Sequence, residues 1–107
     1  MKRVILIVFL LCASLAIAAE RFNVVFVYPT YVGETQLKPG QCRLTLEGDQ
    51  AIFEQGKHRL EVPVKVETVE NKYRHTTVRY HIDGDKYMVS EIRLGGTNRK
   101  LVFQTSS

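Results

Sequence analysis

Apolar and polar side chains alternate along most of this chain, and that pattern constrains its fold more than any other feature. Within residues 58–69, every second position from 60 to 66 is apolar: Leu60, Val62, Val64 and Val66. A period of two places successive side chains on opposite faces of a β-strand. No segment after residue 19 keeps the period of an α-helix. The pattern therefore predicts an all-β fold whose strands pack on one face and meet solvent on the other.

Seven strands are predicted, each bounded by turn residues. We expect them at residues 22–28, 41–47, 51–54, 58–69, 73–82, 86–94 and 99–105. Residues 30–40 contain Gly33, Pro39 and Gly40 and are expected to form a connection that ends in a turn. Short strands at this spacing predict a small antiparallel meander, folded as a sandwich or a partly open barrel.

The alternation also predicts how strands pair. We expect residues 58–69 and 73–82 to form a hairpin around a three-residue turn at 70–72. The inward residues of both strands have even numbers, so paired residue numbers must add up to an even value. Val62 is then expected to lie opposite Tyr80.

The turn at Asp83–Asp85 is expected to close the next hairpin. If Ile92 and Leu94 point inward, this turn must have an odd length, with Gly84 or the aspartate after it at positive φ. Pro63 has no N–H group to donate to a neighbouring strand, so it predicts a sheet edge or a bulge.

The first nineteen residues, MKRVILIVFLLCASLAIAA, differ from the rest of the chain. Lys2 and Arg3 are followed by an apolar run and by Ala16-Ile17-Ala18, a cleavage site with Ala19 as the alternative last residue, and this pattern is typical of a secretory signal. We predict an N-terminal signal helix at 1–19, removed on export, and a single β domain at 20–107 in the periplasm or outside the cell. No membrane span is expected after cleavage. The alternatives are a retained anchor, although the apolar run is short for a bilayer core of ~30 Å, and lipoprotein processing at Cys12, which the neighbouring residues disfavour.

Removal of this segment changes the charge and the cysteine content. Lys2 and Arg3 are two of the fifteen basic residues, so the formal net charge falls from +4 to +2. A nearly neutral domain argues against a nucleic-acid partner. Cys42 then stands alone, in alternation with Leu44 and Leu46. We expect a buried thiol that acts as a small hydrophobe; the alternative is a reactive or dimer-forming thiol.

No catalytic, cofactor or metal site is predicted. His75 and His81 fall on one predicted strand and would lie roughly 20 Å apart, too far to share a metal. Ser90 lies within a strand and not on the sharp turn that a nucleophile requires. The alternative is a small metal-dependent or hydrolytic enzyme that uses His58, His81 and the Asp83–Asp85 turn.

Basic and aromatic residues are expected to share one outer sheet face, which could bind a partner. The residues proposed for this interaction face are Tyr73, Arg79, Tyr87 and Arg93. The alternative is an ordinary solvated face. We therefore predict an exported, non-catalytic binding or interaction module of the cell envelope. Its expected partner is an envelope protein or a glycan, and the protein is expected to be a monomer or a weak homo-oligomer formed through edge strands.

The stretch Leu37-Lys38-Pro39-Gly40-Gln41-Cys42-Arg43-Leu44 resembles a turn-into-strand element of small secreted bacterial β-sandwich proteins. Lys38 replaces the usual small or polar residue, and Cys42 stands where an aromatic residue usually packs. The chain after the signal segment is similar to uncharacterised exported proteins of the acidobacterial type. This resemblance implies the sandwich fold and the exported location, and it implies no catalytic residues.

Overall fold

Residues 19–104 are described by the computed structural model, and they form ten β-strands and no helix. The strands are β1 (Glu20–Phe26), β2 (Thr30–Val32), β3 (Thr35–Leu37), β4 (Gly40–Glu47), β5 (Gln50–Gln55), β6 (His58–Pro63), β7 (Lys65–Thr68), β8 (Thr77–Asp83), β9 (Lys86–Arg93) and β10 (Arg99–Val102). The all-β prediction is confirmed for this part of the chain. The predicted signal helix and Cys12 lie outside the described residues. Within residues 19–104, no helix has the length and apolar character needed to cross a membrane.

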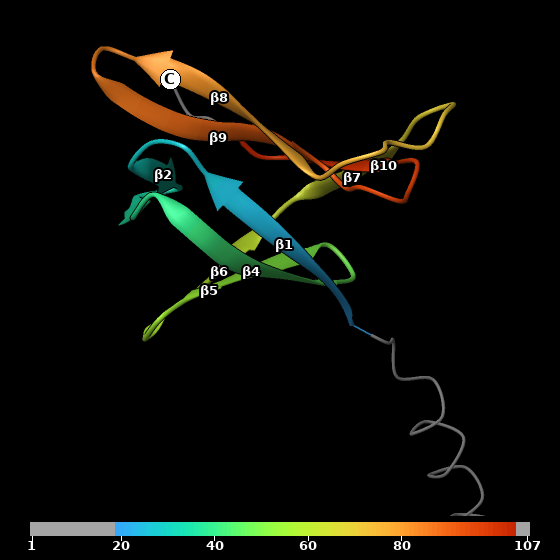
Figure 1. Cartoon of the computed structure of the whole chain (residues 1–107), viewed down its shortest axis with the longest axis horizontal. Helices are drawn as coiled ribbons and strands as arrows, with labels where there is room; N and C mark the ends of the chain where they lie inside the picture. The colour runs from blue at the N-terminus through green and yellow to red at the C-terminus, as the bar shows by residue number, and fades with distance from the viewer. Residues whose placement is uncertain (1–18, 105–107) are drawn as a thin grey trace, which may run out of the picture.

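The described strands form two sheets that face each other and do not close into a barrel (Figure 1). Sheet A has the order β1-β4-β5-β6, and all its pairings are antiparallel. Sheet B has the order β3-β2-β9-β10-β7, and β8 also pairs with β9. Strand β2 runs parallel to β9, so sheet B is not the simple antiparallel meander that the sequence predicts.

Aromatic rings join the two sheets in one core. The ring of Phe53 on β5 lies 6.3 Å from that of Phe26 on β1 and 5.8 Å from that of Phe103, which follows β10. Aliphatic side chains complete the core, including Val24, Leu44, Ala51, Ile92, Leu94 and Leu101, all fully buried. Full burial of each large apolar side chain stabilises the fold by about 1.5–3 kcal/mol.

Residues 30–40 are not the irregular connection that the sequence predicts. They contain β2 and β3, which pair as a short hairpin around Gly33. Thr30 and Val32 are buried, and β2 pairs with β9 through Thr30 and Tyr31. Strands of three residues are too short to show a period of two, which is why the turn residues around them dominated the pattern.

The segment at 58–69 is two strands rather than one. Strand β6 pairs with β5 in sheet A, whereas β7 pairs with β10 in sheet B. The chain changes sheets at Pro63 and Val64, and the N–H group of Val64 donates to the carbonyl oxygen of Asp49 at 2.8 Å. The expected edge position of Pro63 is confirmed, because Pro63 ends the edge strand β6. Inward side chains keep their alternation across the change of sheet, so the sequence pattern conceals it.

The predicted hairpin between residues 58–69 and 73–82 is wrong. Val62 pairs with Ala51 of β5, and Tyr80 pairs with Val89 of β9. Because β6 and β8 belong to different sheets, no register between them exists.

The β8–β9 hairpin has a two-residue turn and not the predicted odd-length turn. Asp83 pairs with Lys86, and Gly84 has a φ of 64°, which confirms the predicted positive φ. The register shifts by one residue between Arg79 and Tyr80, which leaves Ser90 as an extra residue on β9. With a two-residue turn and no bulge, Ile92 and Leu94 would point outward. The extra residue of this β-bulge turns them inward, a shift that the sequence pattern had assigned to an odd-length turn.

Candidate functional site

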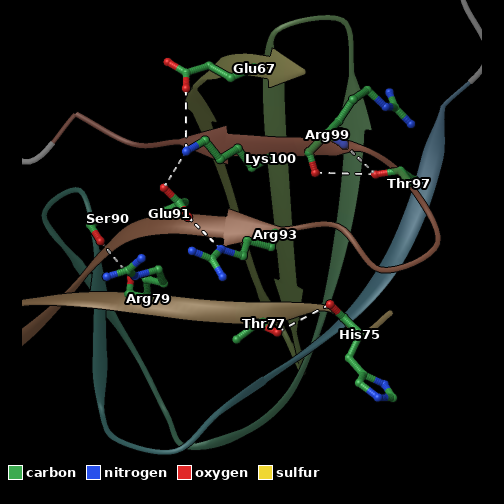
Figure 2. Close-up of polar contacts among 10 residues, drawn as sticks. All are labelled: Glu67, His75, Thr77, Arg79, Ser90, Glu91, Arg93, Thr97, Arg99 and Lys100. Carbon is green, nitrogen blue, oxygen red and sulfur yellow. Dashed lines mark hydrogen bonds and ion pairs between the residues drawn. The ribbon is translucent and has the colours of Figure 1, made fainter. Parts of the chain in front are cut away.

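The bulge at Ser90 decides which β9 side chains reach the outer face of sheet B. Val89 and Ile92 are both buried although they are three positions apart, because the extra residue resets the alternation. Glu91 and Arg93 therefore lie on the outer face, whereas Tyr87 shares the inner side with Val89. The Ser90 hydroxyl donates to the carbonyl oxygen of Arg79 at 3.0 Å and ties the bulge to β8 (Figure 2).

Tyr87 does not join the proposed interaction face, and its placement there is wrong. Its ring stacks on Tyr28 with a centroid distance of 4.0 Å and meets the edge of Tyr80 at 5.8 Å. The Tyr80 hydroxyl accepts a hydrogen bond of 3.1 Å from the N–H group of Val27. These contacts assign Tyr87 to the packing between β1 and sheet B.

A charged network crosses the outer face of sheet B. Glu91 accepts hydrogen bonds from Arg93 Nε at 3.0 Å and from Lys100 Nζ at 3.2 Å. Lys100 also lies 3.8 Å from Glu67, whose other oxygen is 3.6 Å from Lys65. Figure 2 shows Glu91, Lys100 and Glu67 following one another from β9 across β10 to β7. Glu67 and Glu91 are not predicted from the sequence, because their role depends on strand pairings that the alternation pattern does not reveal.

Arg79 lies next to this network but outside its ion pairs. Its partner across the strands is Glu91, yet Oε1 of Glu91 is paired with Lys100 and Oε2 with Arg93. Within the described part of the chain, no carboxylate lies within 4.0 Å of the Arg79 guanidinium. Figure 2 shows Arg79 and Arg93 as neighbours beside Glu91. The face thus carries one exposed guanidinium group with unused donors.

Tyr73 flanks the other side of Arg93. The Arg93 guanidinium carbon lies 5.5 Å from the centroid of the Tyr73 ring, a cation–π geometry. The backbone of Tyr73 bonds to Thr97 and Gly96 at 2.8 Å each, which fixes it against the turn after β9. The structure therefore brings together Tyr73, Arg93 and Arg79, and it separates them from Tyr87.

The carboxylate at the centre of the network stays ionised. Burial alone would raise the pKa of Glu91, but hydrogen bonds from Arg93 and Lys100 outweigh burial and lower it below its ordinary value of 4.5. Glu91 thus neutralises part of the charge of its two partners at neutral pH, and it leaves Arg79 uncompensated.

The histidines of the enzymatic alternative do not converge. His58 begins β6 in sheet A, whereas His81 lies on β8 in sheet B. Their expected proximity depended on the hairpin that the structure replaces. No group of three or more His, Cys, Asp or Glu side chains arranged to hold a metal is found among residues 19–104.

Cys42 is buried, as the sequence predicts. Its exposed fraction is 2%, and it belongs to the core between Val24 and Leu44. Burial raises the pKa of its thiol from 9.0 to about 11. A protonated, inaccessible thiol is a poor nucleophile.

Comparison of the chain with protein-family models, with curated proteins and with solved structures finds no match. The similarity to exported proteins of the acidobacterial type stays a prediction.

Proposed function

We propose that this protein is an exported, non-catalytic binding module of the cell envelope. Its binding surface is the outer face of sheet B, with Arg79 and Arg93 at the centre and Tyr73 at the border. The observation that carries the proposal is the exposed Arg79 guanidinium beside a carboxylate whose two oxygens are already paired.

The surplus charge gives this face a physical reason to bind. Arg79 and Arg93 are diagonal neighbours on adjacent strands, so their positive charges repel each other, and Glu91 offsets only part of that repulsion. An anionic group from a partner would meet several unused N–H donors. Hydrogen bonds between charged groups contribute about 1.5–3 kcal/mol each, more than neutral ones.

Export is proposed from the segment at 1–19, and it places the face in contact with envelope proteins and glycans. The protein acts as a monomer or as a weak edge-strand oligomer. Export predicts that the mature chain begins at residue 19 or 20, which mass spectrometry of the exported protein would detect. A mature chain that retains Met1 would contradict export with cleavage.

Retention of envelope material tests the binding face. The exported protein and its Arg79→Ala and Arg93→Ala variants would be immobilised and incubated with the envelope fraction of the source organism. We expect both variants to retain less material than the wild type. Arg59→Ala is the control, because Arg59 is an exposed arginine of sheet A that is paired with Glu61, as Arg93 is paired with Glu91. Equal retention by all four proteins would refute the proposed face.

A further inference from the structure

We propose that two copies of this protein pair through the open edge of β8 and join their B sheets into one continuous antiparallel sheet. This inference goes beyond the proposed function, which leaves open whether the protein is a monomer. It is carried by the unprotected edge of β8 and by a pattern of charged and apolar side chains along that strand that is complementary to itself.

Strand β8 is a long edge strand without the usual protection. Its one strand partner in the described part of the chain is β9, and it forms the upper border of the molecule in Figure 1. Proteins usually protect such edges with proline, with lysine or by keeping the strand short. The other edges show these devices, because β6 ends on Pro63, β7 contains Lys65 and β3 has three residues. At the end of β1, the N–H group of Val27 is already bonded to the Tyr80 hydroxyl. Strand β8 has seven residues and contains neither proline nor lysine.

The β8–β9 hairpin decides which backbone groups of β8 face the open edge. Along an antiparallel pair, hydrogen-bonded and non-hydrogen-bonded positions alternate. Asp83 and Lys86 close the two-residue turn as a hydrogen-bonded pair, so His81 also directs its backbone groups to β9. The backbone groups of Tyr80 and Ile82 therefore point to the open edge, where a second strand can bond to them.

One register of two antiparallel β8 strands matches opposite charges. When Tyr80 lies opposite Ile82 of the second copy, the open backbone groups of both residues meet, and Arg79 lies opposite Asp83. Neither Arg79 nor Asp83 takes part in an ion pair within residues 19–104. A two-fold axis repeats each contact, so the interface contains this ion pair twice. The neighbouring registers lose the match, because one places Arg79 opposite His81 and the other pairs little more than the strand ends.

The same register covers an exposed apolar side chain. Ile82 is 58% exposed, and among the described residues it is the one large apolar side chain in a strand of sheet B that is exposed. It lies with Tyr80 on the inner side of β8. In the proposed pair, each Ile82 packs against Tyr80 of the other copy, and a β-branched residue opposite an aromatic one is a favourable cross-strand pair.

The pairing leaves the outer face of sheet B open. Residues directly opposite each other point to the same side of a sheet, so both outer faces lie on one side of the joined sheet. A guanidinium group has five N–H donors, and a carboxylate that binds it in the bidentate manner uses two of them. Arg79 thus keeps donors for an envelope partner, and the dimer presents the proposed binding face twice.

Sedimentation velocity of the exported protein over a range of concentrations tests the pairing. We expect a reversible equilibrium between monomer and dimer. Asp83→Arg and Arg79→Asp should each weaken the dimer about tenfold, because repulsion replaces both copies of the ion pair. The double variant, Arg79→Asp with Asp83→Arg, restores opposite charges and should restore the dimer. Asp49→Arg is the control, because Asp49 is an exposed aspartate in the turn between β4 and β5 of sheet A.

Disulfide cross-linking tests the register. In the proposed pair, His81 lies opposite His81 of the second copy at a non-hydrogen-bonded position, where Cα atoms are ~4.5 Å apart, within the range that a disulfide spans. Thr77 lies on the same exposed face of β8, but it is roughly 26 Å from Thr77 of the second copy. We expect His81→Cys to form a covalent dimer on oxidation, and Thr77→Cys not to form one.

The outcomes separate this inference from the proposed function. A protein that stays monomeric at every concentration, a dimer that Asp83→Arg leaves intact, or equal cross-linking of Thr77→Cys and His81→Cys would overturn the pairing through β8. If the protein is monomeric while Arg93→Ala still reduces retention of envelope material, the dimer is wrong and the binding face stands. If the dimer forms while retention is independent of Arg93, the dimer stands and the binding face fails.

Discussion

Cys42 illustrates how burial changes the chemistry of a single side chain. It packs in the core with an exposed fraction of 2%, and burial raises its thiol pKa to about 11. The unfolded chain exposes the same thiol, which then titrates near 9.0. Between about pH 9 and pH 11 the thiol is therefore mostly protonated in the folded protein and mostly ionised in the unfolded chain.

We predict that Cys42 resists thiol reagents until the protein unfolds, and that its contribution to stability depends on pH. Because the folded pKa is raised, this contribution is complete below pH 9 and is lost as the pH rises from about 9 to about 11. Urea unfolding across this range should show a steeper loss of stability for the wild type than for Cys42→Val, which lacks the thiol. Rapid labelling of the folded protein, or identical pH profiles, would show that the thiol is accessible.

Glu91 shows the opposite dependence on pH. Burial works to raise its pKa, but the hydrogen bonds from Arg93 and Lys100 prevail and lower it. The ionised carboxylate therefore stabilises the folded state above its ordinary pKa of 4.5, and this stabilisation is lost as the pH falls below that value.

We predict that Glu91→Gln lowers the free energy of unfolding at neutral pH by about 1 kcal/mol. The substitution keeps the side-chain shape but removes the charge that separates the basic residues around it. Chemical denaturation from neutral to acidic pH should show a flatter acid limb for Glu91→Gln than for the wild type. Glu61→Gln removes an exposed carboxylate of sheet A and serves as the control. If its profile matches that of Glu91→Gln, the network on sheet B adds no stability of its own.

At the scale of elements, the sequence predicts most of the strands but not their partners. The positions of β4, β5, β9 and β10 follow from alternation and turn residues. The sequence of β9 does contain a sign of its bulge: Tyr87 and Val89 are separated from Ile92 and Leu94 by an odd number of positions, so an extra residue must lie between the two pairs if all four point inward. The change of sheet at Pro63 left no such signal, because the inward side chains stay in step across it.

The candidate site shows the same difference between residue types, which the sequence reveals, and strand partners, which it does not. The residue types and the alternation predict Arg79, Arg93 and Tyr73, and the structure brings these three to one face. Tyr87 was misplaced because its face depends on the bulge at Ser90. Neither the pairing of both Glu91 oxygens nor the surplus charge of Arg79 follows from composition, because both require the order of strands in sheet B.

The turn after β9 holds Tyr73 through a close approach of two backbones. A Cβ atom added at Gly95 would lie 2.7 Å from the backbone of His75 and Thr76, a distance that forces the segment before β8 to move. Gly96 has free space around it but a φ of 80°, which strains other residues by about 1–2 kcal/mol. The two adjacent glycines thus serve different purposes.

We predict that Gly95→Ala lowers the free energy of unfolding by about 1–3 kcal/mol, as overpacking does in other cores. It should also displace Tyr73 from Arg93, because the added methyl group pushes on the segment that carries Tyr73. Thermal unfolding would measure the first effect, and NMR chemical shifts of the Tyr73 ring the second. Gly96→Ala should destabilise the protein without the ring shift. A ring shift that appears in both variants, or in neither, would argue against this role of Gly95.

At the scale of the whole molecule, a shared core, hydrogen bonds such as that from Val27 to Tyr80, and an ion pair between distant residues link the two sheets of the described chain. The carboxylate of Glu20 on β1 accepts hydrogen bonds from both terminal nitrogens of Arg99 on β10, one of them at 2.8 Å. Both side chains are partly exposed, so the pair contributes no more than about 1 kcal/mol. Phe53 of sheet A, in contrast, contacts rings from both sheets. Cooperative unfolding of the two sheets must therefore depend mainly on their shared core.

This arrangement predicts that damage to sheet A is felt in sheet B. Tyrosine signals report on sheet B, because the chain has no Trp and its five tyrosines lie in or against that sheet: Tyr28, Tyr31, Tyr73, Tyr80 and Tyr87. Phe53→Leu should lower the free energy of unfolding by about 1.5 kcal/mol, and the near-UV tyrosine transition should shift together with the far-UV transition. Val25→Ala, at a side chain 57% exposed, should shift neither. If the tyrosine transition stays in place while the far-UV transition moves, the sheets unfold independently and the binding face on sheet B does not need sheet A for its stability.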